Sequence, residues 1–190
     1  MPELPDVEVF RRRLEGGALG RPLARVRVEE PRVLEGTTPQ GLGRLLQGRR
    51  LTTARRHGKH LFAGLDRDGG LVMHFGMSGE LRLLDPGAEA PAYSACRLVF
   101  EDGGQVAYLT RRKLGRVIPA PSLEDFVGAQ GLGPDALDLG PGDLARAVAR
   151  YRGTLKSWLM NQGAIAGIGN VYSDEVLFQA RLPPGRPAAS

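Results

Sequence analysis

The stretch Arg97-Leu-Val-Phe-Glu-Asp-Gly-Gly-Gln-Val-Ala-Tyr-Leu109 indicates most plainly how the first part of this chain folds. Two runs that contain valine and aromatic residues flank the segment Glu101–Gly104. Glycine adopts the positive backbone angles that tight turns between antiparallel strands need. The stretch therefore predicts a β-hairpin.

Strand-like patterns extend on both sides of this hairpin, from about Pro22 to Ala120. Apolar and cationic residues alternate over residues 25–28, and Leu71–Phe75 is a short apolar run. Glycines 76 and 79 bracket a turn, after which the pattern resumes at Glu80–Leu84. Many antiparallel strands joined by glycine-containing turns predict a β-sandwich.

Helical spacing precedes and follows this region. Apolar positions over residues 6–19 predict an N-terminal helix, with Pro2 and Pro5 ahead of it. Three more helices are predicted after a segment rich in Gly, Pro and Asp. The apolar residues of the first are Leu144, Val148 and Tyr151, and those of the second are Leu155, Leu159 and Met160. The third carries Val171, Val176, Leu177 and Phe178. Asp143 and Asn170 are the candidate caps of the first and third of these helices.

The expected fold class is therefore α+β. A leading helix and an antiparallel β-sandwich occupy residues 1–130, and a linker occupies 131–142. A helical module follows over 143–182, and a tail over 183–190 is expected to be disordered.

The charge of the chain favours a polyanionic partner. Lys and Arg number 26 against 21 acidic residues, for a net charge of +5, and many cluster at Arg11–Arg13, Arg55–His60 and Arg111–Lys113. Each phosphate that a cation neutralises releases counterions, which favours binding of nucleic acid. An ordinary solvated surface remains the alternative.

Other classes are disfavoured by what the sequence lacks. The single cysteine, Cys96, lies in a predicted strand and is expected to be a buried thiol, and one cysteine excludes a disulfide or a multi-thiolate zinc site within these residues. No apolar run approaches the length of a membrane span, and the N-terminus has no signal-peptide core. Cytoplasmic residence is the default expectation.

The N-terminus Met1-Pro-Glu carries the clearest chemical pattern. Removal of Met1 would leave Pro2 with a free secondary amine, and an α-amino group has a pKa of about 8, so part of it is nucleophilic at neutral pH. Attack on the anomeric carbon of a sugar gives an iminium ion, and Glu3 could protonate the ring oxygen as a general acid. Alternatively, Pro2 is a simple start residue and Glu3 an acid favoured by the helix dipole.

Four blocks in order resemble the formamidopyrimidine-DNA glycosylase/endonuclease VIII family. They are Met1–Glu8, Arg55–Phe62, His74–Arg82 and the block that runs from Lys156 to Phe178. The resemblance implies a β-sandwich joined to a helix-two-turns-helix module. It also implies excision of an oxidised purine, 8-oxoguanine or formamidopyrimidine, followed by strand nicking at the abasic site.

The same resemblance assigns expected roles. Pro2 matches the Schiff-base nucleophile, Glu3 the general acid, and Lys59 a strand lysine that assists elimination. An enzyme must flip a nucleotide out of the stack to reach its anomeric carbon, and an inserted side chain fills the gap. The DNA-contacting residues expected from the matching positions are His74, Met77, Tyr93, Arg112, Lys113, Asn170, and Arg152 and Lys156 on the preceding helices.

Several positions depart from the family pattern. Thr110–Gly115 stands where the family usually has Asp-Pro-Arg-Arg-Phe-Gly, so that Arg112 is retained but Leu114 replaces an aromatic wedge. Tyr93 stands where a histidine often touches DNA, and Asp6 replaces a usual glutamate. These differences put the choice of damaged base in question.

The family normally continues into a zinc finger with four cysteines, which supplies an arginine for DNA binding and the second elimination. One cysteine cannot build that site, so no zinc and no other cofactor is expected, and the chain is either a fragment or a shortened member. We expect a monomer that binds double-stranded DNA with a damaged base or an abasic site. The alternatives are an inactive or weakly active damage-binding homologue, and a basic sandwich that binds RNA or a protein.

Overall fold

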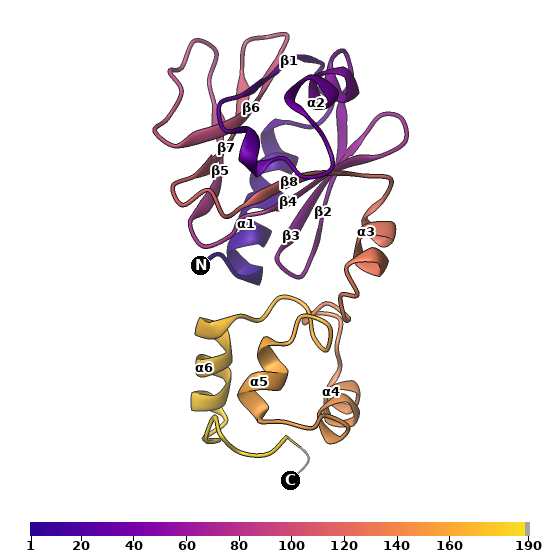
Figure 1. Ribbon diagram of the computed structural model, residues 1–190, viewed down its shortest axis with the longest axis vertical. Coiled ribbons are helices and arrows are strands. Elements are labelled where there is room, and N and C mark those ends of the chain that lie inside the picture. Colours follow the sequence, from indigo (N-terminus) through magenta and orange to yellow (C-terminus); the bar gives the residue numbers. More distant parts are fainter. Residues whose placement is uncertain (189–190) are drawn as a thin grey trace. The chain divides into compact units, whose positions relative to one another are not determined.

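The computed structural model describes residues 1–188 and confirms the α+β class (Figure 1). The chain divides into two units, one formed by Met1–Arg56 and His60–Phe126, the other by His57–Lys59 and the chain from Val127 onward. Within residues 1–188, no helix combines the length and the apolarity needed to cross a membrane.

The first unit is a β-sandwich of two four-stranded sheets. One sheet has the strand order β1 (Leu23–Val28), β6 (Ser94–Phe100), β7 (Gln105–Thr110) and β5 (Gly79–Leu84). The other has the order β2 (Leu51–His57), β3 (His60–Leu65), β4 (Gly70–His74) and β8 (Arg116–Ala120). The predicted hairpin is confirmed as β6 and β7, in which Leu98 lies opposite Val106.

The turn predicted at glycines 76 and 79 connects the two sheets. Strand β4, before the turn, pairs with β8, whereas β5, after it, pairs with β7. Residues 75–78 therefore lie where the chain crosses from one layer to the other.

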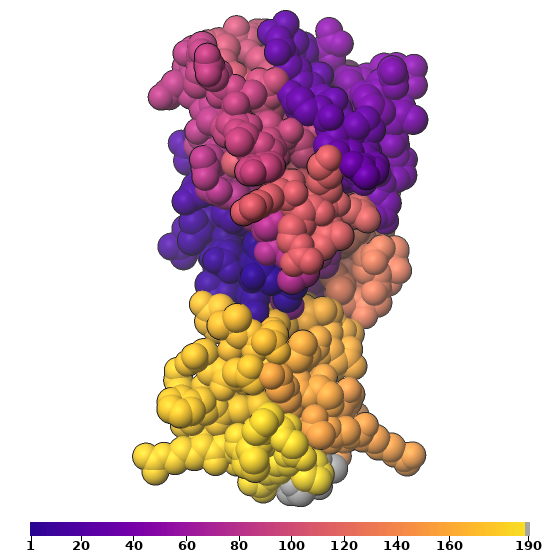
Figure 2. All heavy atoms as spheres, turned by 60° about the vertical axis from the view of Figure 1, so that its left-hand side comes forward, coloured from indigo at the N-terminus to yellow at the C-terminus, as the bar shows by residue number. Residues whose placement is uncertain are grey.

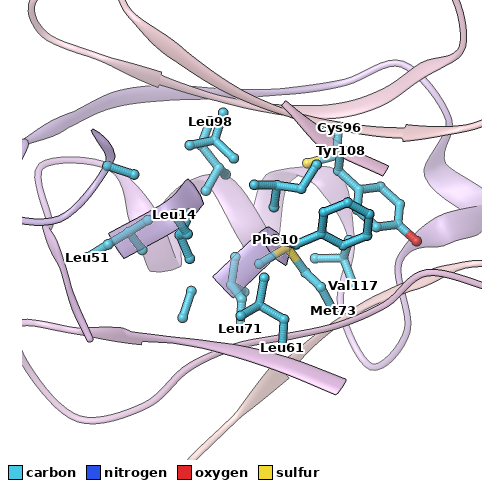
Figure 3. Packing of buried hydrophobic residues seen from close by; sticks show 14 of the residues in the cluster. Phe10, Leu14, Leu51, Leu61, Leu71, Met73, Cys96, Leu98, Tyr108 and Val117 are labelled. Carbon is cyan, nitrogen blue, oxygen red and sulfur yellow. The ribbon is translucent and has the colours of Figure 1, made fainter. Parts of the chain in front are cut away.

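Helix α1 (Leu4–Gly17) contributes one face to the core of the sandwich. Its residues Val7, Phe10 and Leu14 are buried in one cluster with side chains of both sheets, as Figure 3 shows for Phe10 and Leu14. Full burial of such a side chain contributes about 1.5–3 kcal/mol. The helix begins at Leu4, two residues before the expected start, because Pro5 fits the first turn, where its missing N–H would have no partner.

Glu8 joins α1 to its neighbours and gives a testable pH dependence. Its carboxylate pairs with Arg11 at 2.9 Å and with Arg56 of β2 at 3.5 Å. Hydrogen bonding from Arg11, helped by Arg12 and opposed by partial burial, lowers the pKa of Glu8 from 4.5 to about 2. A carboxylate whose pKa is depressed by folding stabilises the fold above the unfolded pKa, and the stabilisation is lost as the pH falls through the folded pKa.

The substitution Glu8→Gln is therefore expected to lower the free energy of unfolding at neutral pH. The difference from the parent protein should shrink as the pH falls from 4.5 toward 2, where Glu8 becomes protonated. Urea unfolding at a series of pH values measures it. A difference that stays constant through this range would contradict the assignment.

Two short helical elements lie within the region that was expected to be strand-like, and a third follows it. They are the 3₁₀-helix η1 (Pro31–Val33) and the helices α2 (Pro39–Leu46) and α3 (Leu123–Ala129). In α2, the Thr38 hydroxyl accepts a hydrogen bond from the Gly41 N–H at 3.1 Å, and Leu42 and Leu46 are buried. Thr-Pro at the start and leucines four residues apart were the signals for this helix, which the sequence analysis missed.

The second unit holds α4 (Pro141–Ala149), α5 (Leu155–Met160) and α6 (Asn170–Gln179). Its core is a small cluster of Trp158, Leu159, Ile165 and Leu177. Residues 131–142, expected to be a linker, include segments hydrogen-bonded to the turn before α6. The Gly133 N–H donates to the Gln162 carbonyl and the Ala136 N–H to that of Ala166, each at 2.9 Å.

Both caps predicted in this unit are wrong. The N-cap of α4 is Gly140, since Pro141 suits the first helical position, and Asp143 lies in the first turn and accepts from the Gly140 N–H at 3.3 Å. The N-cap of α6 is Gly169, whose backbone is extended, so Asn170 is the first helical residue.

The tail differs from the expected disorder over residues 183–188. The Arg186 carbonyl accepts a hydrogen bond from the Leu155 N–H at 2.9 Å, and the Ala188 N–H donates to the Gly153 carbonyl at 2.9 Å. Ala188 is buried. Backbone pairing of this kind does not depend on the composition from which disorder was inferred; residues 189 and 190 lie outside the described part of the chain.

Cys96 is confirmed as a buried thiol in β6. Burial is the main cause that raises its pKa to about 12. Because the thiolate is the reactive form, Cys96 is inert near neutral pH.

Candidate active site

A cavity of about 450 Å³ in the first unit is lined by the N-terminus of the chain. Pro2 and Asp6 line it together with Met77 and Ser78 from the crossing between the sheets and with Gly79 at the start of β5. The N-terminal segment lies at the surface of this unit (Figure 2). The fold thus brings Pro2 and Met77, which are distant in sequence, to one cavity.

Glu3 lies directly before α1 and is 1% exposed. Its backbone N–H donates to the Asp6 carboxylate at 2.8 Å, which fixes the start of the helix. Asp6, which stands in place of a longer family carboxylate, is thus used in capping and also faces the cavity. A buried carboxyl next to Pro2 in the chain has the chemistry of a proton donor for a sugar attacked by the proline nitrogen.

Two loops of the first unit meet beside this cavity. The Arg112 N–H donates to the Ser78 hydroxyl at 3.2 Å, and the Tyr108 hydroxyl donates to the His74 carbonyl at 2.7 Å. Gly76 has a φ of +56°, and a Cβ at this position would lie 2.6 Å from the Leu114 carbonyl carbon. Close approach of the loops 75–78 and 111–115 therefore requires glycine at position 76.

Large apolar side chains on these loops are exposed. Met77 is 46% exposed and Leu114 is 47% exposed, and Tyr93, on the loop before β6, is 60% exposed. The Arg111 guanidinium carbon lies 5.8 Å from the centre of the Tyr93 ring. Apolar side chains beside cations are the combination that inserts into base stacks while contacting phosphates.

Lys113 has a carboxylate partner in this structure. Its ammonium group lies 2.5 Å from a carboxylate oxygen of Glu30. The backbone φ angle is positive at Lys113, 55°, and also at Tyr93, 65°. Hydrogen bonds from Arg32, and then from Lys113, lower the pKa of Glu30 to about 2. A phosphate would have to compete with Glu30 for Lys113.

His74 and Lys59 do not line the 450 Å³ cavity. His74 ends β4 opposite His60, with ring centres 5.0 Å apart. Lys59 is buried and belongs to the second unit, where it lies in the turn between β2 and β3 rather than on a strand as expected. Within that unit, the Asp135 carboxylate accepts from the Gly58 N–H at 2.6 Å and from the Leu137 N–H at 3.0 Å, a positioning role that the sequence analysis missed.

The three candidate residues of the helical module differ in their surroundings. Arg152 is exposed on the loop before α5, not on a helix as expected, whereas Lys156 is on α5 and its ammonium group pairs with Asp174 at 2.6 Å. Asn170 is exposed at the first position of α6, where free backbone amides favour an anion. Gln162 braces the turn before α6 by donating to the Ile168 carbonyl at 2.8 Å.

Within residues 1–188, no group of three or more His, Cys, Asp or Glu side chains is placed to hold a metal ion.

The contact at Gly76 gives a prediction for the loop that carries Met77. A Gly76→Ala substitution should separate the loops 75–78 and 111–115, because the new Cβ would meet backbone and the φ is positive. Strain of this kind costs about 1–3 kcal/mol, so we expect weaker binding to abasic-site DNA in a gel-shift titration.

The control is Gly43→Ala on α2, where no atom lies within 4 Å of the added Cβ. This variant should bind DNA as the parent does. Equal binding by the Gly76 and Gly43 variants would show that the contact between the two loops does not matter for binding.

Comparisons with known proteins identify the family of this chain. Residues 1–117 match the model of the formamidopyrimidine-DNA glycosylase N-terminal domain, and residues 131–190 match that of the formamidopyrimidine-DNA glycosylase H2TH domain. The formamidopyrimidine-DNA glycosylase of Methylococcus capsulatus is 39% identical over 193 residues, covering 99% of this chain and 70% of that protein. The one from Moorella thermoacetica is 37% identical over 194 residues, covering 100% of this chain and 71% of that protein.

Solved structures give the same result. The complex of the Lactococcus lactis enzyme with DNA that contains an abasic site has a TM-score of 0.91 at 27% identity, covering 100% of this chain and 70% of that one. The complex of that enzyme with DNA containing an oxidised pyrimidine has a TM-score of 0.90 at 28% identity, covering 99% and 71%. The α+β fold with its helix-two-turns-helix module is thus confirmed, and the chain belongs to the formamidopyrimidine-DNA glycosylase family.

Proposed function

We propose that this chain removes an oxidised purine from double-stranded DNA and then nicks the abasic site through an iminium ion on Pro2. The observation that carries the proposal is the cavity lined by Pro2 and Met77, with the buried Glu3 next to Pro2 in the chain. Relatives of known structure bound to abasic-site or damaged DNA support DNA as the partner.

The chemistry follows from the groups available. With Met1 removed, the Pro2 nitrogen forms a bond to the anomeric carbon while the glycosidic bond breaks and its electron pair leaves with the base. The proton that the Pro2 nitrogen then loses passes to solvent, and the departing base takes up a proton from solvent. Glu3 gives its proton to the ring oxygen as the sugar opens, which leaves an iminium ion on Pro2. Loss of a proton from the adjacent carbon then expels the 3′ phosphate; Lys59 is the residue we assign to assist this step.

Met77 and the exposed residues of the neighbouring loops would hold the DNA open. A methionine is flexible and apolar enough to occupy the gap left by an everted base, and Leu114 and Arg112 on the second loop would face the unpaired base opposite. Tyr93, His74, Lys113, Arg152, Lys156 and Asn170 are proposed as further DNA contacts.

A second candidate function is binding of damaged DNA without turnover. It is favoured by the carboxylate partners of Lys113 and Lys156 and by Leu114 in the wedge position, which would weaken the grip on DNA. A single assay separates the two candidates.

That assay uses an end-labelled duplex with one 8-oxoguanine, incubated with protein from which Met1 has been removed. Cleavage after alkali reports base excision, and cleavage without alkali reports nicking; we expect both, and neither on the undamaged duplex. A gel shift with the damaged duplex but no cleavage in either sample would reject the enzyme and support binding alone.

A further inference from the structure

A second cavity in the first unit, of about 460 Å³, lies on a different part of the sandwich. It is lined from the sheet by Arg25 and Arg27 of β1, Arg97 and Val99 of β6, and Gln105 of β7, and beside the sheet by residues 87–90 between β5 and β6. Alternate residues of the strands, such as Val26, Leu98 and Val106, pack in or against the core. The cavity is therefore on the outer face of this sheet.

Three guanidinium groups border this cavity because of the strand register. Arg27 lies opposite Arg97 on the neighbouring strand. Arg25 is two residues before Arg27 on the same strand face, so their backbones are roughly 6.6 Å apart, within the reach of two long side chains toward one ligand.

Arg97 is fixed in place. It is 8% exposed; its Nε donates to Glu29 at 2.8 Å, and its Nη1 donates to the Gln105 side-chain oxygen at 2.9 Å. The Gln105 amide nitrogen in turn donates to the Ala88 carbonyl at 3.3 Å. These contacts hold the residues around Ala88 against the sheet, so the cavity is a preformed feature.

Arg25 and Arg27, unlike Arg97, have side chains that are not held by partners in the described part of the protein. Both are exposed, and within the described residues 1–188 neither takes part in an ion pair or a side-chain hydrogen bond. The carboxylate of Glu29 is already engaged by Arg97, and Glu89 is the one acidic residue among those that line the cavity. Two cations at one cavity, neither of them paired with a carboxylate within residues 1–188, favour an anionic ligand.

We propose that this cavity binds a small anion with two linked phosphoryl groups, either inorganic pyrophosphate or the diphosphate of a nucleotide. The planar fork of arginine matches phosphate oxygens in pairs, and two unpaired forks suit two adjacent phosphoryl groups. The volume lies in the range of small-molecule sites. Val99 and Ala88 add an apolar wall against which a base could pack.

This site is independent of the proposed excision chemistry. No residue lines both this cavity and the one that contains Pro2. Gln105 lies at the start of β7 and faces the second cavity together with Arg97. The loop with Met77 precedes β5 and the loop with Arg112 follows β7. Both loops therefore lie at the other end of this strand pair, where Gly79 is opposite Thr110.

The test is isothermal titration of the intact chain with pyrophosphate, ADP, adenosine and an acidic peptide at constant ionic strength. Pyrophosphate and ADP should bind and adenosine and the peptide should not. The Arg25→Ala/Arg27→Ala variant should bind about tenfold more weakly or worse. The control, Arg44→Ala/Arg67→Ala, removes the same charge from exposed positions elsewhere and should bind as the parent does.

The two sources give different results. Tighter binding of ADP than of pyrophosphate identifies a nucleotide as the ligand, and equal binding identifies the diphosphate alone as the recognised group. Full binding by the Arg25/Arg27 variant, no binding of either phosphate ligand, or preference for the acidic peptide would overturn the proposal. So would displacement of pyrophosphate by an abasic-site duplex, which would make the cavity part of the DNA-binding surface.

Discussion

Replacing Glu3 with glutamine should slow base excision by about 10²–10⁴-fold, the usual contribution of a general acid. Glutamine has nearly the same size as the buried glutamate but cannot supply a proton. At the start of α1 the Glu3 backbone N–H donates to Asp6, and the Glu3 side chain accepts from the Asp6 backbone. Glutamine keeps both an N–H and a side-chain oxygen, so the helix should keep its position.

Two rates are measured: single-turnover excision on an 8-oxoguanine duplex, and formation of the iminium ion on DNA that is already abasic. The Glu3→Gln variant should lose the first activity and keep most of the second, since an abasic sugar is in equilibrium with its open aldehyde, which Pro2 can attack without a proton on a ring oxygen. The control is Glu15→Gln, on the same helix but not lining the cavity. Equal losses of both activities would show that Glu3 is needed for structure, and no loss would remove it from the mechanism.

The substitution Trp158→Ala should destabilise the second unit by about 3–5 kcal/mol, because it replaces the largest side chain of a small core. Trp158 is 2% exposed and packs with Leu159, Ile165 and Leu177. A loss of this size is a large fraction of the free energy of unfolding of an ordinary domain. We therefore expect the helical module to unfold at lower temperature and DNA binding to fall with it.

Helical circular dichroism followed through a thermal transition measures this effect without relying on tryptophan fluorescence. The matched control is Phe178→Ala in the same unit, where the aromatic ring is 80% exposed; it should change stability by no more than about 0.5 kcal/mol. Equal transition temperatures for the two variants would contradict the assignment of Trp158 to the core of this unit.

The elements that the sequence predicted best are those whose pattern is local. The hairpin of β6 and β7 has apolar strands and a glycine turn within thirteen consecutive residues, 97–109, and the N-terminal helix has a regular apolar face. Helix α2 was missed because Gly41 and Gly43 lower its helical propensity, and its stability comes from burying Leu42 and Leu46. That burial is a tertiary effect, so the local signals, Thr38-Pro39 and the spacing of the two leucines, were too weak to identify the helix on their own.

In the candidate site, too, the features that could be predicted are those carried by residues that are neighbours in the sequence. Pro2 and Glu3 are adjacent in the chain, so their shared chemistry is visible in the sequence. The carboxylate partners of Lys113 and Lys156 come from Glu30 and Asp174, and these ion pairs depend on how distant segments pack. No spacing rule would have found them, or the cavity that Pro2 shares with Met77.

Borohydride trapping on abasic DNA tests the proposed role of Pro2 most directly. Protein from which Met1 has been removed should give a covalent protein–DNA adduct, and peptide mapping should assign it to Pro2. The same chain with Met1 retained should give no adduct at Pro2, because the Pro2 nitrogen is then part of a peptide bond. An adduct that maps to Lys59 or another lysine, or no adduct from processed protein that binds the DNA, would contradict the account.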